Sequence, residues 1–373
     1  MRKIKKTKIV ATLGPASSSR KTIKAMMESG VNVFRINFSH ADHKDVLERI
    51  EIIRELNVSL GYHVAILADL QGPKLRVGKM AEGTVVKDGQ EVQFTTDKLE
   101  LGTADAIYMN YKRFPQDVTP GERILLDDGK LIFEIVETDK KARVKARVIQ
   151  GGELKSKKGV NLPNTNISLP ALTEKDVEDA IFAIKQDVDW IALSFVRHKQ
   201  DVEDLRKLIQ EHGKYDIPII SKIEKPEALA NIKEIVKASN ALMVARGDLG
   251  VEVAAEEVPI VQKELVQHAK LARIPVIVAT QMMESMIDGL TPTRAEVNDV
   301  ANSVMDGADA VMLSGETSVG KYPVKVIQTM RRILVSVENS PLIQVPHKAP
   351  KKKNERFVTK SVCYHAATMA DEI

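Results

Sequence analysis

Apolar runs alternate with amphipathic stretches along most of the chain, and this pattern predicts β-strands that are each followed by an α-helix. Residues 44–60 illustrate the helical pattern, because apolar side chains recur there at helical spacing. Strands are expected at residues 8–14, 31–39, 63–70, 189–196, 219–224, 241–246, 275–280 and 310–313. Further helices are expected before Gly30, after Thr173 and from Pro226, and over residues 200–212, 262–272, 294–305 and 324–337. Strand–helix alternation of this kind implies a parallel sheet.

The alternation stops between about Pro73 and Asn166, where short β-rich pieces are separated by turn sequences. These turns lie at Asp88, Pro120, Asp127 and Gly151. The pattern predicts a small all-β domain, which we expect to be a β-barrel, inserted after the third strand. Without this insertion and the C-terminal tail, the strand–helix units have a length near the ~250 residues typical of a (β/α)8 barrel.

The expected fold class is therefore α/β: a (β/α)8 TIM barrel formed by residues 1–72 and 167–340, with residues 73–166 as an inserted all-β lid domain after strand 3. Residues 340–357 contain three prolines and a lysine run, which is the composition of a linker. From Thr359 onward, apolar side chains share one face of a helix. We interpret residues 341–373 as a linker and the first helix of a truncated C-terminal α/β domain.

Composition narrows the function classes. A net charge of +4 on 373 residues is too small to favour nucleic acid binding, and no basic stripe carries interleaved aromatic residues. The single cysteine, Cys363, cannot form an internal disulfide, and the cytoplasm is the expected compartment. No apolar run reaches transmembrane length and no signal-type core follows the basic N-terminus, so no membrane association is expected.

The chemistry-bearing residues gather at the predicted strand ends. Lys222 and Glu224 are two positions apart on a strand, so their side chains point to the same face. Taken alone, the pair has a plain structural interpretation as a buried ion pair. Other strand ends are polar too, however, at Arg35, Asn37, Ser39, Asp69, Asp248, Thr280, Ser314 and Glu316. Because the carboxyl ends of barrel strands share one rim, a common site is the better explanation.

These residue types restrict the reaction. Glu224 and Asp248 offer hard oxygen ligands without histidine or cysteine nearby, which suits Mg2+. Arg35, Arg76 and Lys222 supply positive charge for a substrate that bears phosphate and carboxylate. Metal with lysine and arginine is typical of phosphoryl transfer. No Walker-type phosphate loop or dinucleotide fingerprint is present.

Several segments in order resemble the pyruvate kinase family. They are Lys-Ile-Val-Ala-Thr-Leu-Gly-Pro-Ala-Ser (8–17), Arg-Ile-Asn-Phe-Ser-His (35–40), Lys-Gly-Val-Asn-Leu-Pro (158–163), Ile-Ile-Ser-Lys-Ile-Glu (219–224), Val-Ala-Arg-Gly-Asp-Leu-Gly-Val-Glu (244–252), Ala-Thr-Gln-Met-Met (279–283), Pro-Thr-Arg-Ala-Glu (292–296) and Met-Leu-Ser-Gly-Glu-Thr (312–317). The resemblance runs from about Thr7 to the end of the chain. It implies transfer of phosphate from phosphoenolpyruvate to ADP, giving pyruvate and ATP in the last step of glycolysis.

The resemblance also implies roles for individual residues. Lys222 would stabilise the migrating phosphoryl group and the enolate oxygen, and Arg35 would contact the phosphoryl group. Glu224 and Asp248 would hold Mg2+, for which Mn2+ substitutes. The backbone of Gly247 and Asp248 and the hydroxyl of Thr280 would bind the substrate carboxylate. Thr280, Ser314 and Glu316, together with water, would relay the proton to the enolate carbon. The nucleotide site falls to Asn37, Phe38, Ser39, His40, Arg76 and Lys158, the last in a lid that excludes water. Members of the family are homotetramers, and a dimer is the alternative for this chain.

One departure from the family concerns K+. Potassium-dependent members usually read Asp-Thr-Lys-Gly-Pro-Glu where this chain reads Asp-Leu-Gln-Gly-Pro-Lys, residues 69–74. The ammonium of Lys74 would supply the charge that K+ provides elsewhere, as in the potassium-independent branch. The monovalent-cation pocket itself would still consist of Asn37, Ser39, Asp69 and the Leu70 carbonyl.

Two other functions stay open from the sequence. A related barrel could act as a Mg2+-dependent lyase or aldolase on pyruvate enolate, although such an enzyme has less need of a nucleotide lid. A catalytically silent binding module is the second alternative, and the full set of charged residues argues against it.

Overall fold

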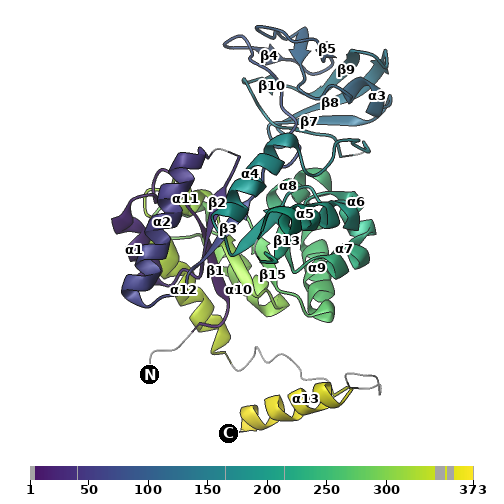
Figure 1. Ribbon diagram of the computed structural model, residues 1–373. Helices are drawn as coiled ribbons and strands as arrows, with labels where there is room; N and C mark the ends of the chain where they lie inside the picture. The colour runs from purple at the N-terminus through teal and green to yellow at the C-terminus, as the bar shows by residue number, and fades with distance from the viewer. Residues whose placement is uncertain are drawn as a thin grey trace.

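The computed structural model describes residues 5–39, 41–163, 165–213, 215–340, 349–350 and 357–372. Its central strands are β1 (Lys8–Thr12), β2 (Val33–Asn37), β3 (Ala65–Asp69), β12 (Trp190–Leu193), β13 (Ile219–Ile223), β14 (Ala241–Ala245), β15 (Val276–Ala279) and β16 (Ala310–Leu313). They form one closed, parallel barrel in the order β1-β16-β15-β14-β13-β12-β3-β2 (Figure 1). The expected (β/α)8 barrel is confirmed.

The barrel strands are mostly apolar on both faces because both faces are covered. Every residue of β13, β14, β15 and β16 is buried, as expected for parallel strands between an inner core and surrounding helices. Alternate residues divide between the two cores: Met243 of β14 packs inside the barrel, whereas Leu242 and Val244 pack against the helices. The strand ends are therefore held rigidly, which fixes the direction of any side chain placed there.

Several helices of the barrel begin at side-chain caps. The barrel helices are α1 (Arg20–Ser29), α2 (His43–Leu60), α4 (Glu174–Lys185), α5 (Lys199–His212), α6 (Pro226–Ala230), α7 (Ile232–Ala238), α8 (Arg246–Glu252), α9 (Val258–Ala272), η1 (Glu284–Ile287), α10 (Arg294–Asp306), α11 (Gly315–Ser318) and α12 (Pro323–Glu338). Those with side-chain caps include α1, α2, α4 and α10. Thr173 and Thr293 each form a capping box with an acid three residues later. Gly30 ends α1 in the left-handed conformation that glycine adopts without strain.

The inserted segment forms a lobe of its own, joined to the barrel beside α4 in Figure 1. Its elements are β4 (Val85–Val86), β5 (Glu91–Thr95), β6 (Ala106–Tyr108), α3 (Phe114–Asp117), β7 (Arg123–Leu126), β8 (Leu131–Thr138), β9 (Arg143–Gln150), β10 (Gly152–Glu153) and β11 (Val160–Asn161). The strands pair as a six-stranded sheet, β11-β7-β8-β9-β5-β6, and a two-stranded sheet, β10-β4, and not as the single closed barrel expected. A separate core with Phe94, Phe114 and Phe133 at its centre supports the lobe.

Local differences from the expected elements arise where the sequence lacks a clear period. The strand expected over 241–246 ends at Ala245, and the Gly-Asp-Leu-Gly stretch that follows belongs to helix α8. The helix expected from Pro226 is two short helices, α6 and α7, divided at Asn231. Helix α13 (Phe357–Glu372) agrees with the helix expected near the end, while residues 341–348 and 351–356 of the expected linker lie outside the described residues. Within the described residues, no helix is long and apolar enough to cross a membrane.

Candidate active site

The ammonium of Lys222 lies at the centre of the polar residues on the barrel rim. Its Nζ donates to Ser194 Oγ at 2.7 Å and lies 3.0 Å from Glu224 Oε1 and 3.2 Å from Asp69 Oδ1. Burial alone would disfavour the charge, but the attraction of Asp69 and Glu224 outweighs it and raises the pKa of Lys222. The side chain is therefore a fixed positive charge and not an acid or base near neutral pH.

Arg35 stands beside this lysine and shares a carboxylate with it. Its Nε donates to Asp69 Oδ2 at 2.5 Å and its Nη1 to Thr12 Oγ1 at 3.0 Å. Burial raises the pKa of Asp69, but Arg35 and Lys222 outweigh that effect and hold the pKa below its ordinary value. Two cations thus share Asp69 on this side of the rim, and both carry hydrogen-bond donors suited to an anionic ligand.

Glu224 meets the chemical conditions for a metal ligand. Its Oε2 accepts the Phe195 backbone N–H at 2.7 Å, while Oε1, although close to Lys222, has no hydrogen bond of normal geometry. Burial raises the pKa of Glu224 and Asp248 adds to the rise, and the attraction of Lys222 only partly offsets these two effects. A bound cation would relieve this repulsion, so the residues present fit a divalent ion.

The donor set also indicates which ligands such an ion would use. Within the described part of the chain, no group of three or more histidine, cysteine, aspartate or glutamate side chains could enclose a metal. An ion held by Glu224 and Asp248 would therefore draw its other ligands from substrate and water. Mg2+ is bound in this manner, through one or two carboxylates and a substrate phosphate.

Thr280 and Gly247 form a second polar group, at the ends of β14 and β15. The Gly247 N–H donates to Thr280 Oγ1 at 2.7 Å, and that hydroxyl donates to the Ala279 carbonyl at 2.7 Å. A Cβ on residue 247 would lie 3.2 Å from Thr280 Oγ1, so glycine permits this close approach. Thr280 has φ 74°, which for a β-branched residue costs about 1–3 kcal/mol and is a feature of functional sites.

Ser314 and Glu316 lie after β16, and the Glu316 carboxylate is already engaged. Glu316 is buried, and its two carboxylate oxygens accept the backbone N–H groups of Met283 at 3.1 Å and Ser314 at 2.7 Å. In this state the carboxylate holds two loops together. A role for Glu316 in proton transfer stays a prediction.

The residues expected to bind nucleotide are spread over the barrel and the inserted lobe. In the lobe, Arg76 donates to the Lys157 carbonyl at 2.9 Å, and Lys158 pairs with Asp127 at 2.8 Å. On the barrel, Asn37 Oδ1 accepts the Ser39 N–H at 3.1 Å. Among the described residues, the hydrogen bonds and ion pairs of the Arg76 and Lys158 side chains stay within the inserted lobe.

Two further residues of that group behave differently from the rest. The Phe38 side chain is fully buried and packs edge-on against Phe182, so its ring cannot face a ligand. Its backbone N–H donates to the Asp69 carbonyl, and its carbonyl accepts from Lys175 Nζ, both at 3.0 Å. His40 lies outside the described residues.

The expected monovalent-cation pocket is partly filled by the protein's own contacts. Asp69 is paired with Arg35 and Lys222, and the Leu70 carbonyl accepts the Ser194 hydroxyl at 2.6 Å. Lys74 is exposed and lines the same small cavity as Asp248. Lys74 thus borders the candidate site, and among the described ion pairs none includes it.

The sequence did not identify the residues that hydrogen-bond to Lys222 and Glu224 and orient them. Ser194 and the Phe195 N–H, at the end of β12, orient Lys222 and Glu224, yet that strand end carries no charge to attract notice. The signal that could have found Ser194 is its position directly after β12, on the same rim as the other polar strand ends. Arg246 was also missed as an individual residue.

Comparisons with known proteins agree on one family. Residues 4–327 match the family model described as "Pyruvate kinase, barrel domain". The chain is 51% identical over 331 residues to a protein of Corynebacterium glutamicum named pyruvate kinase, covering 88% of this chain and 69% of that protein. It is 48% identical over 347 residues to the pyruvate kinase of Mycobacterium tuberculosis, covering 91% and 72%. For the pyruvate kinase of Geobacillus stearothermophilus the identity is 48% over 338 residues, covering 90% and 57%.

Proposed function

We propose a function for this chain from its membership of the pyruvate kinase family, to which it belongs. The chain transfers the phosphoryl group of phosphoenolpyruvate to ADP at the barrel rim, beside Lys222, Glu224 and Asp248. In this reaction the bond between phosphorus and the enolate oxygen breaks. A new bond forms to a terminal oxygen of ADP, and the enolate gains a proton on carbon to become pyruvate. The observation that carries the assignment is the buried ammonium of Lys222, held between Glu224, Asp69 and Ser194.

In this proposal Lys222 and Arg35 neutralise charge on the migrating phosphoryl group. Phosphoryl transfer needs little covalent participation by the protein, so positioning and charge neutralisation supply most of the rate. The raised pKa of Lys222 supports this role, because a residue that stays charged can stabilise both the phosphoryl group and the enolate oxygen. The Asp69 carboxylate keeps Arg35 and Lys222 side by side.

Pyruvate kinases generally use Mg2+ and K+. For this chain, Glu224 and Asp248 would hold Mg2+, with Mn2+ as a substitute, and the bound ion would withdraw negative charge from the phosphoryl oxygens. The raised pKa of Glu224, to which Asp248 contributes, and its Oε1 without a hydrogen bond support these two ligands. We propose that Lys74 replaces K+, and that Asn37, Ser39, Asp69 and Leu70 are what remains of its pocket.

The substrate carboxylate is proposed to bind the backbone of Gly247 and Asp248 and the hydroxyl of Thr280. These groups are close together and polar, and the strained backbone of Thr280 is typical of a functional position. Proton delivery to the enolate carbon is proposed to involve Thr280, Ser314 and Glu316 through water. Glu316 would have to release one of its backbone contacts to take part.

ADP is proposed to bind between the barrel and the inserted lobe. Pyruvate kinases bind phosphoenolpyruvate and ADP, and the residues assigned here are Asn37, the Phe38 backbone, Ser39, His40, Arg76 and Lys158. Residues 73–166 would act as the lid, residues 1–72 and 167–340 as the catalytic barrel, and 341–373 as the start of a third domain. Closure of such a lid excludes water from the transfer. A homo-oligomer and a cytoplasmic location complete the proposal.

A lactate-dehydrogenase-coupled assay tests the function. The purified chain with phosphoenolpyruvate, ADP and Mg2+ should oxidise NADH, and omission of either ADP or Mg2+ should stop the reaction. Pyruvate formed without ADP would instead support a lyase or phosphatase, and no pyruvate under any condition would support a silent binding module. The family match does not favour either alternative.

A further inference from the structure

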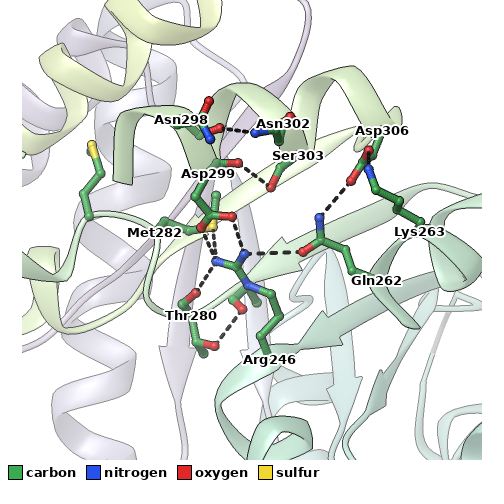
Figure 2. Close-up of polar contacts among 12 residues, drawn as sticks. Arg246, Gln262, Lys263, Thr280, Met282, Asn298, Asp299, Asn302, Ser303 and Asp306 are labelled. Atoms are coloured by element: carbon green, nitrogen blue, oxygen red, sulfur yellow. Dashed lines mark hydrogen bonds and ion pairs between the residues drawn. The ribbon is translucent and has the colours of Figure 1, made fainter. Parts of the chain in front are cut away.

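This inference rests on the carboxylate site proposed above and concerns Arg246, the first residue of α8. Its guanidinium lies between the ends of β14 and β15 and helix α10 (Figure 2). Nη1 donates to Asp299 Oδ1 at 2.6 Å and Nη2 to Asp299 Oδ2 at 2.7 Å, a bidentate ion pair. The Arg246 side chain is only 12% exposed, so this pair anchors the guanidinium firmly to α10.

The anchored guanidinium also fixes the backbone at the end of β15. Nη2 donates to the Thr280 carbonyl at 2.7 Å, with Met282 Sδ 2.9 Å away. Thr280 and Gln281 have φ values of 74° and 53°, a left-handed turn that side-chain-bearing residues rarely adopt. The hydrogen bond to the carbonyl holds the peptide plane that this turn requires.

The same residue adjoins the other half of the proposed carboxylate site. Gly247 follows Arg246 in the chain, and its N–H contacts Thr280 Oγ1. Arg246 therefore ties together the two strand ends from which the proposed carboxylate ligands come. A substrate carboxylate would replace the hydrogen bond between the Gly247 N–H and Thr280 Oγ1 and bind both groups. This binding requires the two groups to keep their present spacing.

We propose that Arg246 is a positioning residue for the substrate carboxylate, and that Asp299 acts through it. The guanidinium does not itself bind substrate, because Nη1 is used by Asp299 and Gln262 and Nη2 by Asp299 and the Thr280 carbonyl. Its effect is to keep the Thr280 hydroxyl and the Gly247 N–H aligned. Specificity for a carboxylate-bearing substrate then depends on a residue outside the binding contacts.

The test compares variants that weaken the clamp to different degrees. Arg246→Lys keeps the charge but cannot reach Asp299 and the Thr280 carbonyl together, and Asp299→Asn keeps the shape but loses the ion pair. Lys263→Gln is the matched control, since it breaks the neighbouring ion pair with Asp306 and leaves the bonds of Arg246 to Asp299 and to the Thr280 carbonyl in place (Figure 2). Each variant is assayed for the KM of phosphoenolpyruvate, the KM of ADP, kcat and thermal midpoint, and phosphoenolpyruvate binding with Mg2+ but without ADP is measured by calorimetry.

The expected result is selective. Arg246→Lys should raise the KM and the dissociation constant of phosphoenolpyruvate about tenfold or more, a loss of about 1.4 kcal/mol or more in binding. Asp299→Asn should change both in the same direction by a smaller factor, while the KM of ADP stays within about twofold for both variants. Lys263→Gln should resemble the wild-type protein.

Two outcomes would overturn the inference. An unchanged KM for phosphoenolpyruvate in Arg246→Lys would show that the clamp does not position the carboxylate site. Equal changes in both KM values together with a lower thermal midpoint would show a merely structural role. A wild-type protein that does not bind phosphoenolpyruvate would instead overturn the proposed function, so the two failures are distinguishable.

Discussion

Replacing Lys222 by methionine removes the central charge of the site at nearly constant shape. A unit charge about 4 Å from a phosphoryl oxygen, at an effective dielectric constant of about 20, contributes about 4 kcal/mol. If that attraction develops mainly in the transition state, kcat falls by roughly a thousandfold. Arg35 and the metal remain, so the dissociation constant of phosphoenolpyruvate should rise by less than about tenfold.

The substitution also leaves Glu224 and Asp69 without the buried ammonium 3.0 and 3.2 Å away, which makes loss of stability a competing explanation. Removing one partner of a buried ion pair costs about 3–5 kcal/mol. Lys225→Met is the matched control, because Lys225 is equally buried, pairs with Glu252 at 2.6 Å and has no proposed role in the transfer.

The coupled assay, calorimetric binding of phosphoenolpyruvate and thermal melting should be measured for both lysine variants. We expect both to lose stability but only Lys222→Met to lose turnover, with Lys225→Met keeping kcat within about tenfold. A Lys222→Met protein that folds and retains kcat would refute the reasoning. Equal loss of turnover in the two variants would attribute the effect to stability.

Further predictions concern the cations and the lid. Activity should be the same in potassium and tetraalkylammonium salts, and Lys74→Glu should make it depend on K+; dependence on K+ in the wild-type protein would contradict the role of Lys74. Burial and Asp248 raise the pKa of Glu224 above its ordinary value of 4.5, so in the metal-free protein this group's contribution to stability is present below that value and is lost as pH rises through the folded pKa. Mg2+ binds the ionised carboxylate, so the rise in thermal midpoint on adding Mg2+ should grow as the pH increases from 4.5 through the folded-state pKa of Glu224. A rise independent of pH would argue against Glu224 as a ligand. Asp117→Ala should destabilise the inserted lobe by about 1–3 kcal/mol in urea titration, because the buried Tyr111 hydroxyl and the Ser168 N–H and hydroxyl lose their acceptor, and an unchanged midpoint would show that this contact is dispensable.

The barrel could be predicted from the sequence because its strands are buried on both faces. Strands such as Ala310–Leu313 read as short, continuous apolar runs, and polar side chains follow them where the rim begins. The strand period of two was sufficient to predict that the Lys222 and Glu224 side chains share one face. The structure places their charged atoms 3.0 Å apart.

Other features of the fold and the site could not be predicted from the sequence, because they depend on contacts between distant segments. The left-handed turn at Thr280 has no glycine to mark it and is held by Arg246, the first residue of helix α8. The pairing of the inserted strands into two sheets depends on registers between strands of similar composition, which turn sequences do not specify.

The most direct test of the proposed site is anomalous diffraction from crystals grown with Mn2+ and a non-transferable analogue of phosphoenolpyruvate. We predict one strong manganese peak bound by carboxylate oxygens of both Glu224 and Asp248, with the Lys222 ammonium within hydrogen-bond distance of the phosphoryl group. A manganese peak away from these two carboxylates, or a phosphoryl group that Lys222 does not contact, would contradict the account.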